Sequence, residues 1–531
     1  MWRSRSRPSS NTSARSPTWS GRWKRRWKRS KLAGPRSWRS RRRSRSRPTR
    51  RMCRSACLAW PGCRAMCCAT RSELWKPRRM GKRTMQLPLG LPEEETRLRP
   101  EVAALPTRAE RLARLLQGDL DFHGRQDASP LHALHPFPAK YPPQLPRLFI
   151  QHLTQPGEVV LDPMMGSGTT VLEARRLGRR AVGTDIDPLA LHLVAAKVAP
   201  PSPLAFEEGF ARVLRRAEAH LGAAGRLAEE YARRFDDATQ RFLDYWFLPD
   251  TQRELLALSM AIAQEAPALR LFLQIVFSSL IIAKSGSVAQ ARDLSHTRPH
   301  RVRKPVKPAL EVFRVKARRA LRMLTEHAGF PPTAPPALLA EADAQHLPLP
   351  TDSVALIVTS PPYAANAIDY MRAHKFTLVW WGYSVRQLSA LRREYIGGEA
   401  LQGVCLEPLP GPAERAVEQI AAVDPKKGRV LHRYFSEMRR VLWAMRRVLV
   451  PGGAAVLVVG ESTMRGQPAQ VPQSLGAIGE QVGLALVSIG ERRLDRDRRM
   501  MPARRGRAAT AIEQRMHVEY VLGFVKPGGK P

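Results

Sequence analysis

Short apolar runs alternate with amphipathic stretches along residues 131–202 and again along residues 340–531. In the first of these parts, Glu158–Asp162 predicts a buried strand and is followed by a glycine-rich turn. Thr170–Leu177 then predicts a helix, and Arg180–Asp185 predicts a second strand. This order is the opening of a doubly wound parallel sheet. We therefore expect an α/β fold with a Rossmann-like sheet.

The same alternation resumes in the second part. Val354–Thr359 is a continuous apolar run, which is typical of a strand buried on both faces. Leu431–Val450 predicts an amphipathic helix, Ala454–Val459 predicts the strand after it, and Val518–Val525 predicts the last strand. Residues 131–202 and 340–531 are therefore expected to form one domain in two parts.

A helical segment, residues 203–339, is expected to interrupt this domain. It is rich in Leu, Ala and Arg, has apolar residues at helical spacing, and ends in the basic loop Arg292–Pro308. This segment is a candidate for recognising a nucleic-acid target through its basic loop. The alternative interpretation is that the loop is only a solvated charged loop. Residues 85–130 are expected to lead into the domain, with helical spacing over Glu93–Gly118. Four residues of the loop are candidates for binding nucleic-acid phosphates: Arg298, Arg301, Arg303 and Lys304.

Residues 1–84 differ in composition from the rest of the chain. They hold 28 Lys and Arg against a single acid, Glu73, together with seven of the eleven Trp and five of the six Cys. They show no helical or strand periodicity, which predicts a disordered segment. Disordered nucleic-acid-binding tails are usually poor in aromatic residues, so we expect that translation begins at Met80 or Met85. A real basic tail that raises DNA affinity is the alternative.

Charge and cysteine spacing narrow the class of partner. The formal net charge is +42, of which residues 85–531 account for +15. This basic body favours a polyanionic partner, nucleic acid before membrane. No apolar run is long enough to span a bilayer, and the N-terminus lacks the apolar stretch of a signal peptide, so a soluble cytoplasmic protein is expected. The cysteines lack zinc-site spacing, and no metal is expected.

The first candidate site follows the strand Glu158–Asp162, where Gly166 and Gly168 open a helix. Glycines let a ligand approach the backbone, and a helix N-terminus offers free N–H groups. Asp185 ends the next strand, where a carboxylate can accept hydrogen bonds from ribose hydroxyls. The pattern predicts a site for a nucleoside-containing cofactor. NAD enzymes share this logic, and a purely structural glycine turn is the alternative.

The second candidate site is the sequence Ser360-Pro361-Pro362-Tyr363, directly after a buried strand. The two prolines fix the backbone, and their carbonyls and the Ser360 hydroxyl are free to accept hydrogen bonds from an exocyclic amine. Tyr363 offers an aromatic face on which a flipped-out base can stack. A Pro-Pro turn with a packed tyrosine is the alternative.

Together the two motifs resemble those of the DNA amino-methyltransferases. Asp162–Thr170 resembles the cofactor motif of that family, with Met164 where phenylalanine is usual, and Ser360–Tyr363 matches its catalytic motif. His135–Tyr141 resembles the segment that lines the methionine end of the cofactor, and Glu341–Ala344 resembles the site whose acid contacts the adenine.

The resemblance implies a Rossmann-like methyltransferase sheet, S-adenosylmethionine as cofactor, DNA as partner, and a cognate restriction enzyme as a candidate second partner. In that family the Ser form of the catalytic motif is associated mainly with N4 of cytosine and the Asp form with N6 of adenine, so cytosine is favoured. The family does not usually place target recognition where residues 203–339 lie. The implied cofactor-binding residues are Lys140, Asp162, Pro163, Gly166, Gly168, Thr169, Asp185 and Asp343.

Three other functions stay open at this point. An RNA base methyltransferase can share both motifs. A protein-glutamine methyltransferase would have Asn where this chain has Ser360. A catalytically inactive nucleic-acid-binding protein is the remaining alternative, and the intact motif Ser360–Tyr363 argues against it.

Overall fold

The computed structural model divides the chain into two compact units, of which the second is Leu89–Pro531. All described residues belong to that unit, so the expectations for residues 1–84 lie outside them, as does Arg298 of the basic loop. The described residues are 99–122, 129–283, 285–292, 294, 300–364, 369–494 and 518–528.

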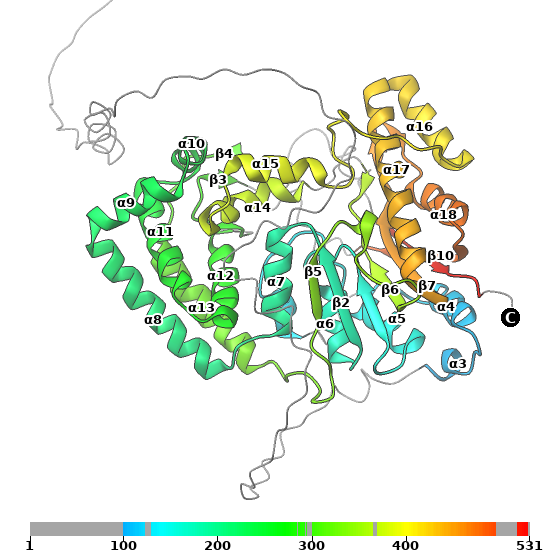
Figure 1. The fold of residues 1–531 in the computed structure, drawn as a ribbon, viewed down its shortest axis with the longest axis horizontal. Helices are drawn as coiled ribbons and strands as arrows, with labels where there is room; N and C mark the ends of the chain where they lie inside the picture. The colour runs from blue at the N-terminus through cyan, green and yellow to red at the C-terminus, as the bar shows by residue number, and fades with distance from the viewer. Residues whose placement is uncertain are drawn as a thin grey trace, which may run out of the picture. The chain divides into compact units, whose positions relative to one another are not determined.

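A seven-stranded sheet lies at the centre of the second unit (Figure 1), in the order β10, β11, β7, β6, β1, β2, β5. The neighbours from β7 to β5 are parallel, whereas β11 is antiparallel to both β7 and β10. The α/β class with a mostly parallel sheet is therefore confirmed. In sheet order the strands are Ala485–Arg493, Val518–Val525, Leu449–Gly460, Val354–Thr359, Val159–Asp162, Arg180–Asp185 and Leu338–Glu341.

Both faces of the sheet are covered by helices. Along β6, Leu356 and Val358 belong to one hydrophobic core and Ile357 belongs to the other, because successive residues of a strand point to opposite faces. Helices α4 to α7 pack in the first core and α16 to α18 in the second. Their bounds are Arg108–Leu116 (α4), Gln144–Leu153 (α5), Thr169–Arg176 (α6), Pro188–Val198 (α7), Gly411–Val423 (α16), Pro425–Val448 (α17) and Val471–Gln481 (α18).

A group of helices lies between α7 and β5 in the chain and, in Figure 1, beside α7. Helix α12 packs on α7, and the helices of the group share the first core. The group ends at Thr325, and β5 begins at Leu338, inside the range expected to be helical. The helices are Pro203–Gly222 (α8), Ala224–Arg234 (α9), Asp237–Trp246 (α10), Pro249–Ala263 (α11), Pro267–Ile281 (α12) and Ala309–Thr325 (α13), with the short strands Ala291–Arg292 (β3) and His300–Arg301 (β4).

The sequence predicts one helix over Glu93–Gly118, whereas the described part of that range contains two helices. Helix α3, Pro100–Ala103, ends before Pro106, and α4 begins after Thr107. The Thr107 side chain accepts a hydrogen bond from the N–H of Glu110, and the Glu110 side chain accepts one from the N–H of Thr107. These two bonds form a capping box. Among the described residues no helix is both long and apolar enough to cross a membrane. The remaining elements are Pro130–Ala133 (η2), Ala344–His346 (η3), Tyr370–Leu378 (α14), Val379–Trp381 (η5), Val385–Glu394 (α15), Thr463–Met464 (β8) and Gln467–Pro468 (β9).

Candidate functional site

A cavity of about 850 Å³, counting its open mouth, lies where β1, β2, β5 and β6 end. Ligands of open α/β sheets bind at this carboxyl edge of the strands. Nine of the residues predicted from the sequence line this one cavity, although up to 222 positions separate them. They are Lys140, Asp162, Pro163, Gly166, Thr169, Asp185, Asp343, Ser360 and Pro362.

The glycine turn forms one wall of the cavity. Gly166 and Gly168 have φ of +46° and +74°, in the left-handed region that favours glycine. Gly168 is the N-cap of α6, and its N–H donates to the Met165 carbonyl at 2.6 Å. The buried Lys197 donates from Nζ to the Ser167 carbonyl at 2.8 Å, which fixes the turn from α7. Burial lowers the pKa of Lys197 well below its usual range.

Gly168→Ala is expected to destabilise the protein by about 2 to 4 kcal/mol, because a Cβ there would lie 2.5 Å from Cγ2 of Val194 in addition to the left-handed φ. Gly178→Ala is the matched control. Gly178 has φ of +73° but nothing within 4 Å of its Cβ position, so about 1 kcal/mol is expected. Urea unfolding of both variants measures the difference, and equal losses of stability would mean that the close approach to α7 is unimportant.

Asp162 joins the glycine turn to the end of β6. It ends β1 and is 2% exposed, and its Oδ1 accepts from Oγ1 of Thr359 at 2.7 Å. Thr359 is the residue before Ser360, so this bond ties the two motifs together across neighbouring strands. The N–H of Met164 donates to the same Oδ1 at 3.2 Å. Burial raises the pKa of Asp162 to about 6.

Asp185 ends β2, and Asp187 follows that strand. The N–H of Gly166 donates to Oδ2 of Asp185 at 2.8 Å, and the N–H of Asp187 donates to its Oδ1 at 2.9 Å. Burial and the charge of Asp187 raise the pKa of Asp185 to about 7. Asp187 caps α7 and bonds through Oδ2 to Nδ1 of the buried His374 at 2.5 Å. Burial opposes ionisation of Asp187, but the charge and hydrogen bond of His374 outweigh it and lower the pKa of Asp187.

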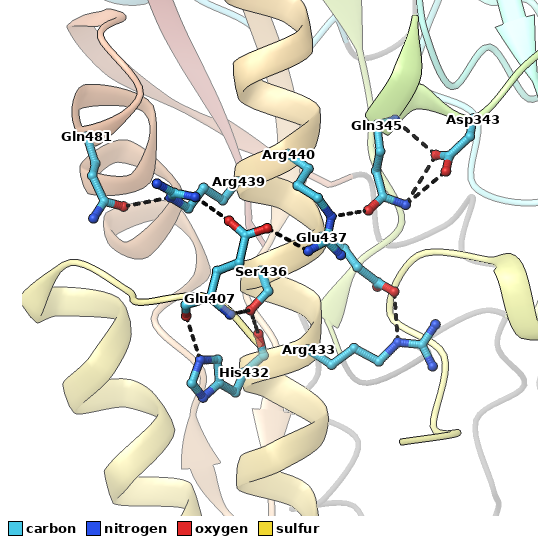
Figure 2. A network of polar contacts seen from close by, with 10 residues as sticks. All are labelled: Asp343, Gln345, Glu407, His432, Arg433, Ser436, Glu437, Arg439, Arg440 and Gln481. Carbon is cyan, nitrogen blue, oxygen red and sulfur yellow. Dashed lines mark hydrogen bonds and ion pairs between the residues drawn. The ribbon is translucent and has the colours of Figure 1, made fainter. Parts of the chain in front are cut away.

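Asp343 is held by a chain of polar contacts that reaches α17 (Figure 2). Gln345 donates from Nε2 to Oδ2 of Asp343 at 3.1 Å and accepts from Nε of Arg440 at 2.7 Å. Arg440 and its neighbour Arg439 both pair with the carboxylate of Glu407. The orientation of Asp343 at the cavity wall therefore depends on side chains outside the cavity.

The residues of the catalytic motif point in different directions. Ser360 and Pro362 line the cavity, whereas Pro361 is buried and Tyr363 does not line it. The Tyr363 hydroxyl donates to Oε1 of Glu519 on β11 at 2.8 Å, and burial and the charge of Glu519 raise the pKa of Tyr363 well above the usual range. Glu519 also pairs with Arg492 of β10 at 2.5 Å. The hydroxyl is thus fixed by the antiparallel end of the sheet.

Several further residues also line the cavity. Asp187 precedes Pro188 at a helix start, a capping signal that the sequence does contain. Tyr395 and Ile396 follow α15 and reach the cavity only through the packing of that helix, so no local pattern marks them. The aromatic residues Phe137, Tyr141 and Tyr370 also line the cavity, and the first two belong to the run His135–Tyr141.

The three predicted phosphate-binding residues that the structure describes, Arg301, Arg303 and Lys304, do not line the cavity. Arg301 and Arg303 are exposed, and the Arg301 guanidinium lies 4.5 Å from the centre of the Tyr245 ring. Lys304 is half-buried and donates from Nζ to the Ala291 carbonyl at 3.0 Å. Of these three described residues, Arg301 and Arg303 are exposed to solvent, whereas Lys304 is not.

Comparison with known proteins agrees with this geometry. Residues 102–196 match the model of a DNA methylase family of N6 and N4 methyltransferases. The Type II methyltransferase M.MjaII of Methanocaldococcus jannaschii is 32% identical over 92 residues, which are 17% of this chain and 17% of that protein. The Type II methyltransferase M.MvaI of Kocuria varians is 41% identical over 76 residues, 14% of this chain and 16% of that protein. The matched part is thus about a sixth of either relative.

Among solved structures, a candidate DNA modification methylase of Thermus thermophilus aligns over 36% of this chain and 53% of its own, at 19% identity and a TM-score of 0.18. At that TM-score the likeness supports neither a fold nor a function, and the fold follows from the strand order above. Residues 102–196 are therefore similar to the DNA methylase family, and parts of the chain are similar to Type II methyltransferases.

Proposed function

We propose that this protein transfers a methyl group from S-adenosylmethionine to an exocyclic amino group of a base in DNA, with N4 of cytosine favoured over N6 of adenine. One observation carries the proposal: the glycine turn, Asp185 and Asp343 share a single cavity with Ser360 and Pro362. A site for a nucleoside-containing donor and a motif suited to an amine acceptor thus meet at one place. The Type II relatives also favour a cognate restriction enzyme as a partner.

The lining of the cavity fits S-adenosylmethionine. Four aspartates, Asp162, Asp185, Asp187 and Asp343, face it against the single lysine Lys140, a balance that favours a positively charged ligand. Asp185 would accept from the ribose hydroxyls, and Asp343 would accept from the adenine amine. A Cβ on Gly166 would lie 3.3 Å from the Phe137 ring, so glycine at this position lets the ring pack against the turn. When bound, the cofactor supplies a methyl group already activated by its sulfonium.

The chain's own residues would hold the acceptor. The hydroxyl of Ser360 and the carbonyls of the two prolines, of which Pro362 lines the cavity, would accept from an exocyclic amine and direct its lone pair into the cavity. The ring of Tyr363 would stack on the base, while its hydroxyl stays bonded to Glu519. Asp162 would keep this loop in register with the glycine turn through its bond to Thr359.

Methyl transfer from radiolabelled S-adenosylmethionine to DNA, RNA and protein, assayed in parallel, tests the proposal. We expect label in DNA. Label only in RNA or only in protein would replace DNA with another substrate, and cofactor binding without transfer to any of the three would identify an inactive nucleic-acid-binding protein.

Arg301→Ala combined with Arg303→Ala is expected to weaken DNA binding and to flatten its salt dependence, by about one unit of slope for each phosphate that is no longer neutralised. Lys304 is left intact because its side chain holds the loop. Fluorescence anisotropy over a range of salt concentrations measures the slope, and the affinity for S-adenosylmethionine should not change. An unchanged slope would mean that the basic loop is only solvated.

A further inference from the structure

We propose that a second cavity, next to the first, binds a phosphate group of the DNA backbone. This phosphate cavity lies between residues 133–136, the end of α12 and the face of α13, and measures about 1000 Å³ counting its open mouth. It lies outside the predicted basic loop, and the cations Lys316 and Arg319 that line it belong to no motif of the sequence. The inference rests on the proposed action on DNA.

The charged residues that line the phosphate cavity are all cationic. They are Lys140, Lys316 and Arg319, and no acid among the described residues lines it. Within the described ranges, neither Lys316 nor Arg319 has an ion-pair partner. Burial and the neighbouring charge of Arg319 lower the pKa of Lys316, so a bound anion would relieve the repulsion between two close cations. Such a group of cations without a carboxylate suits a phosphate.

A buried histidine provides a second, independent observation. His135 lines the phosphate cavity and is fully buried, and its Nε2 lies 2.9 Å from Oγ of Ser278. Its Nδ1 is buried too and has no hydrogen-bond partner among the described residues. An unpaired buried polar atom is costly, and a ligand oxygen in the cavity would accept from Nδ1 when that nitrogen carries the proton.

The position of the phosphate cavity connects it with methyl transfer. Lys140 lines both cavities, and its Nζ is held by the carbonyls of His132 and His135 at 2.8 and 3.2 Å. A phosphate bound there would lie beside the cavity that receives the base. Phosphate contacts fix the register of a strand without reading its sequence, so this site would position the strand whose base enters the first cavity.

The test compares two double variants of α13 that lose the same charge. Lys316→Ala with Arg319→Ala removes two cationic side chains from the lining of the phosphate cavity. Arg318→Ala with Arg322→Ala removes two exposed arginines that do not line it. We expect the first pair to weaken DNA binding about tenfold or more and to lower the salt slope by about one, since it removes a charge-assisted hydrogen bond to phosphate. The control pair should change affinity less than about threefold, and neither should alter S-adenosylmethionine binding.

Equal weakening by both pairs, or no weakening by the first, would overturn the proposal.

Inorganic phosphate, titrated by calorimetry in the absence of DNA, distinguishes the source of the anion. Saturable phosphate binding that needs Lys316 and Arg319, with unchanged DNA affinity in their double variant, would assign the cavity to a free anion and also overturn it. If the wild-type protein methylates DNA while the first pair changes nothing, this site fails and the proposed function stands. If DNA binding depends on the pair but no DNA is methylated, the proposed function fails and the site stands.

Discussion

Ser360→Ala is expected to lower the rate of methyl transfer about 100-fold or more at saturating cofactor, because it removes an acceptor that would hold the amine of the base. The dissociation constant of S-adenosylmethionine should stay within about twofold of the wild type, since the carboxylates that would bind the cofactor are untouched. Tyr363→Ala should act in the same way by removing the ring on which the base would stack. Single-turnover kinetics and calorimetry measure the two quantities separately.

Tyr363→Phe is the matched control for the tyrosine. It keeps the ring and removes only the hydroxyl that donates to Glu519. If stacking is the role of Tyr363, the Phe variant should keep most of the rate that the Ala variant loses. Equal reductions in both would instead make the bond to Glu519 the important feature, and full activity of Ser360→Ala and Tyr363→Ala would remove this loop from the mechanism.

Asp185→Asn is expected to weaken S-adenosylmethionine binding about 10- to 100-fold, the effect of removing a charge-assisted hydrogen bond of about 1 to 3 kcal/mol. The pKa of Asp185 is raised to about 7 by burial and by Asp187. The carboxylate form would accept from the ribose hydroxyls, so affinity in the wild type should fall as the pH drops below about 7. The Asn variant should lack this pH dependence.

Thermal unfolding separates loss of binding from loss of folding. The pKa of Asp185 is higher in the folded protein than in the unfolded chain. The protonated Asp185 therefore contributes to the free energy of unfolding below the pKa of the unfolded chain, and this contribution is lost as the pH rises through about 7. Without cofactor, the wild type should therefore lose stability as the pH rises from 4 to 8, whereas Asp185→Asn should not. The melting temperature of the variant minus that of the wild type should increase over this range. Unchanged cofactor affinity in a folded variant would exclude Asp185 from the site.

The parts of the fold that could be predicted are those with a strong local pattern. The bounds of β2, β6 and β11 agree with the sequence. β6 and β11 are runs of mainly apolar residues, and β2 has four consecutive buried residues and ends at the acid that marked it. The edge strands β5 and β10 could not be predicted. β5 has only four residues, none of them buried, and β10 is mostly half-buried or exposed, so neither has a clear periodicity.

The candidate site follows the same rule. The residues in motifs, from Asp162 to Ser360, were identifiable because turn chemistry and spacing mark them, and the fold brings most of them to one cavity. Tyr395 and the cations of the phosphate cavity come from helices whose faces meet only after packing. The hydroxyl bond of Tyr363 crosses 156 positions to Glu519, which no local pattern could predict. What each residue binds stays a prediction.

The central claim is methylation of a DNA base at its exocyclic amine. Its most direct test is nucleoside mass spectrometry of DNA from cells that express the wild-type protein, with cells that express Ser360→Ala as the control. We expect N4-methylcytosine, or otherwise N6-methyladenine, in the DNA of wild-type cells and neither above background in the control. DNA without either base, from cells in which the folded protein is present, would contradict the proposed function.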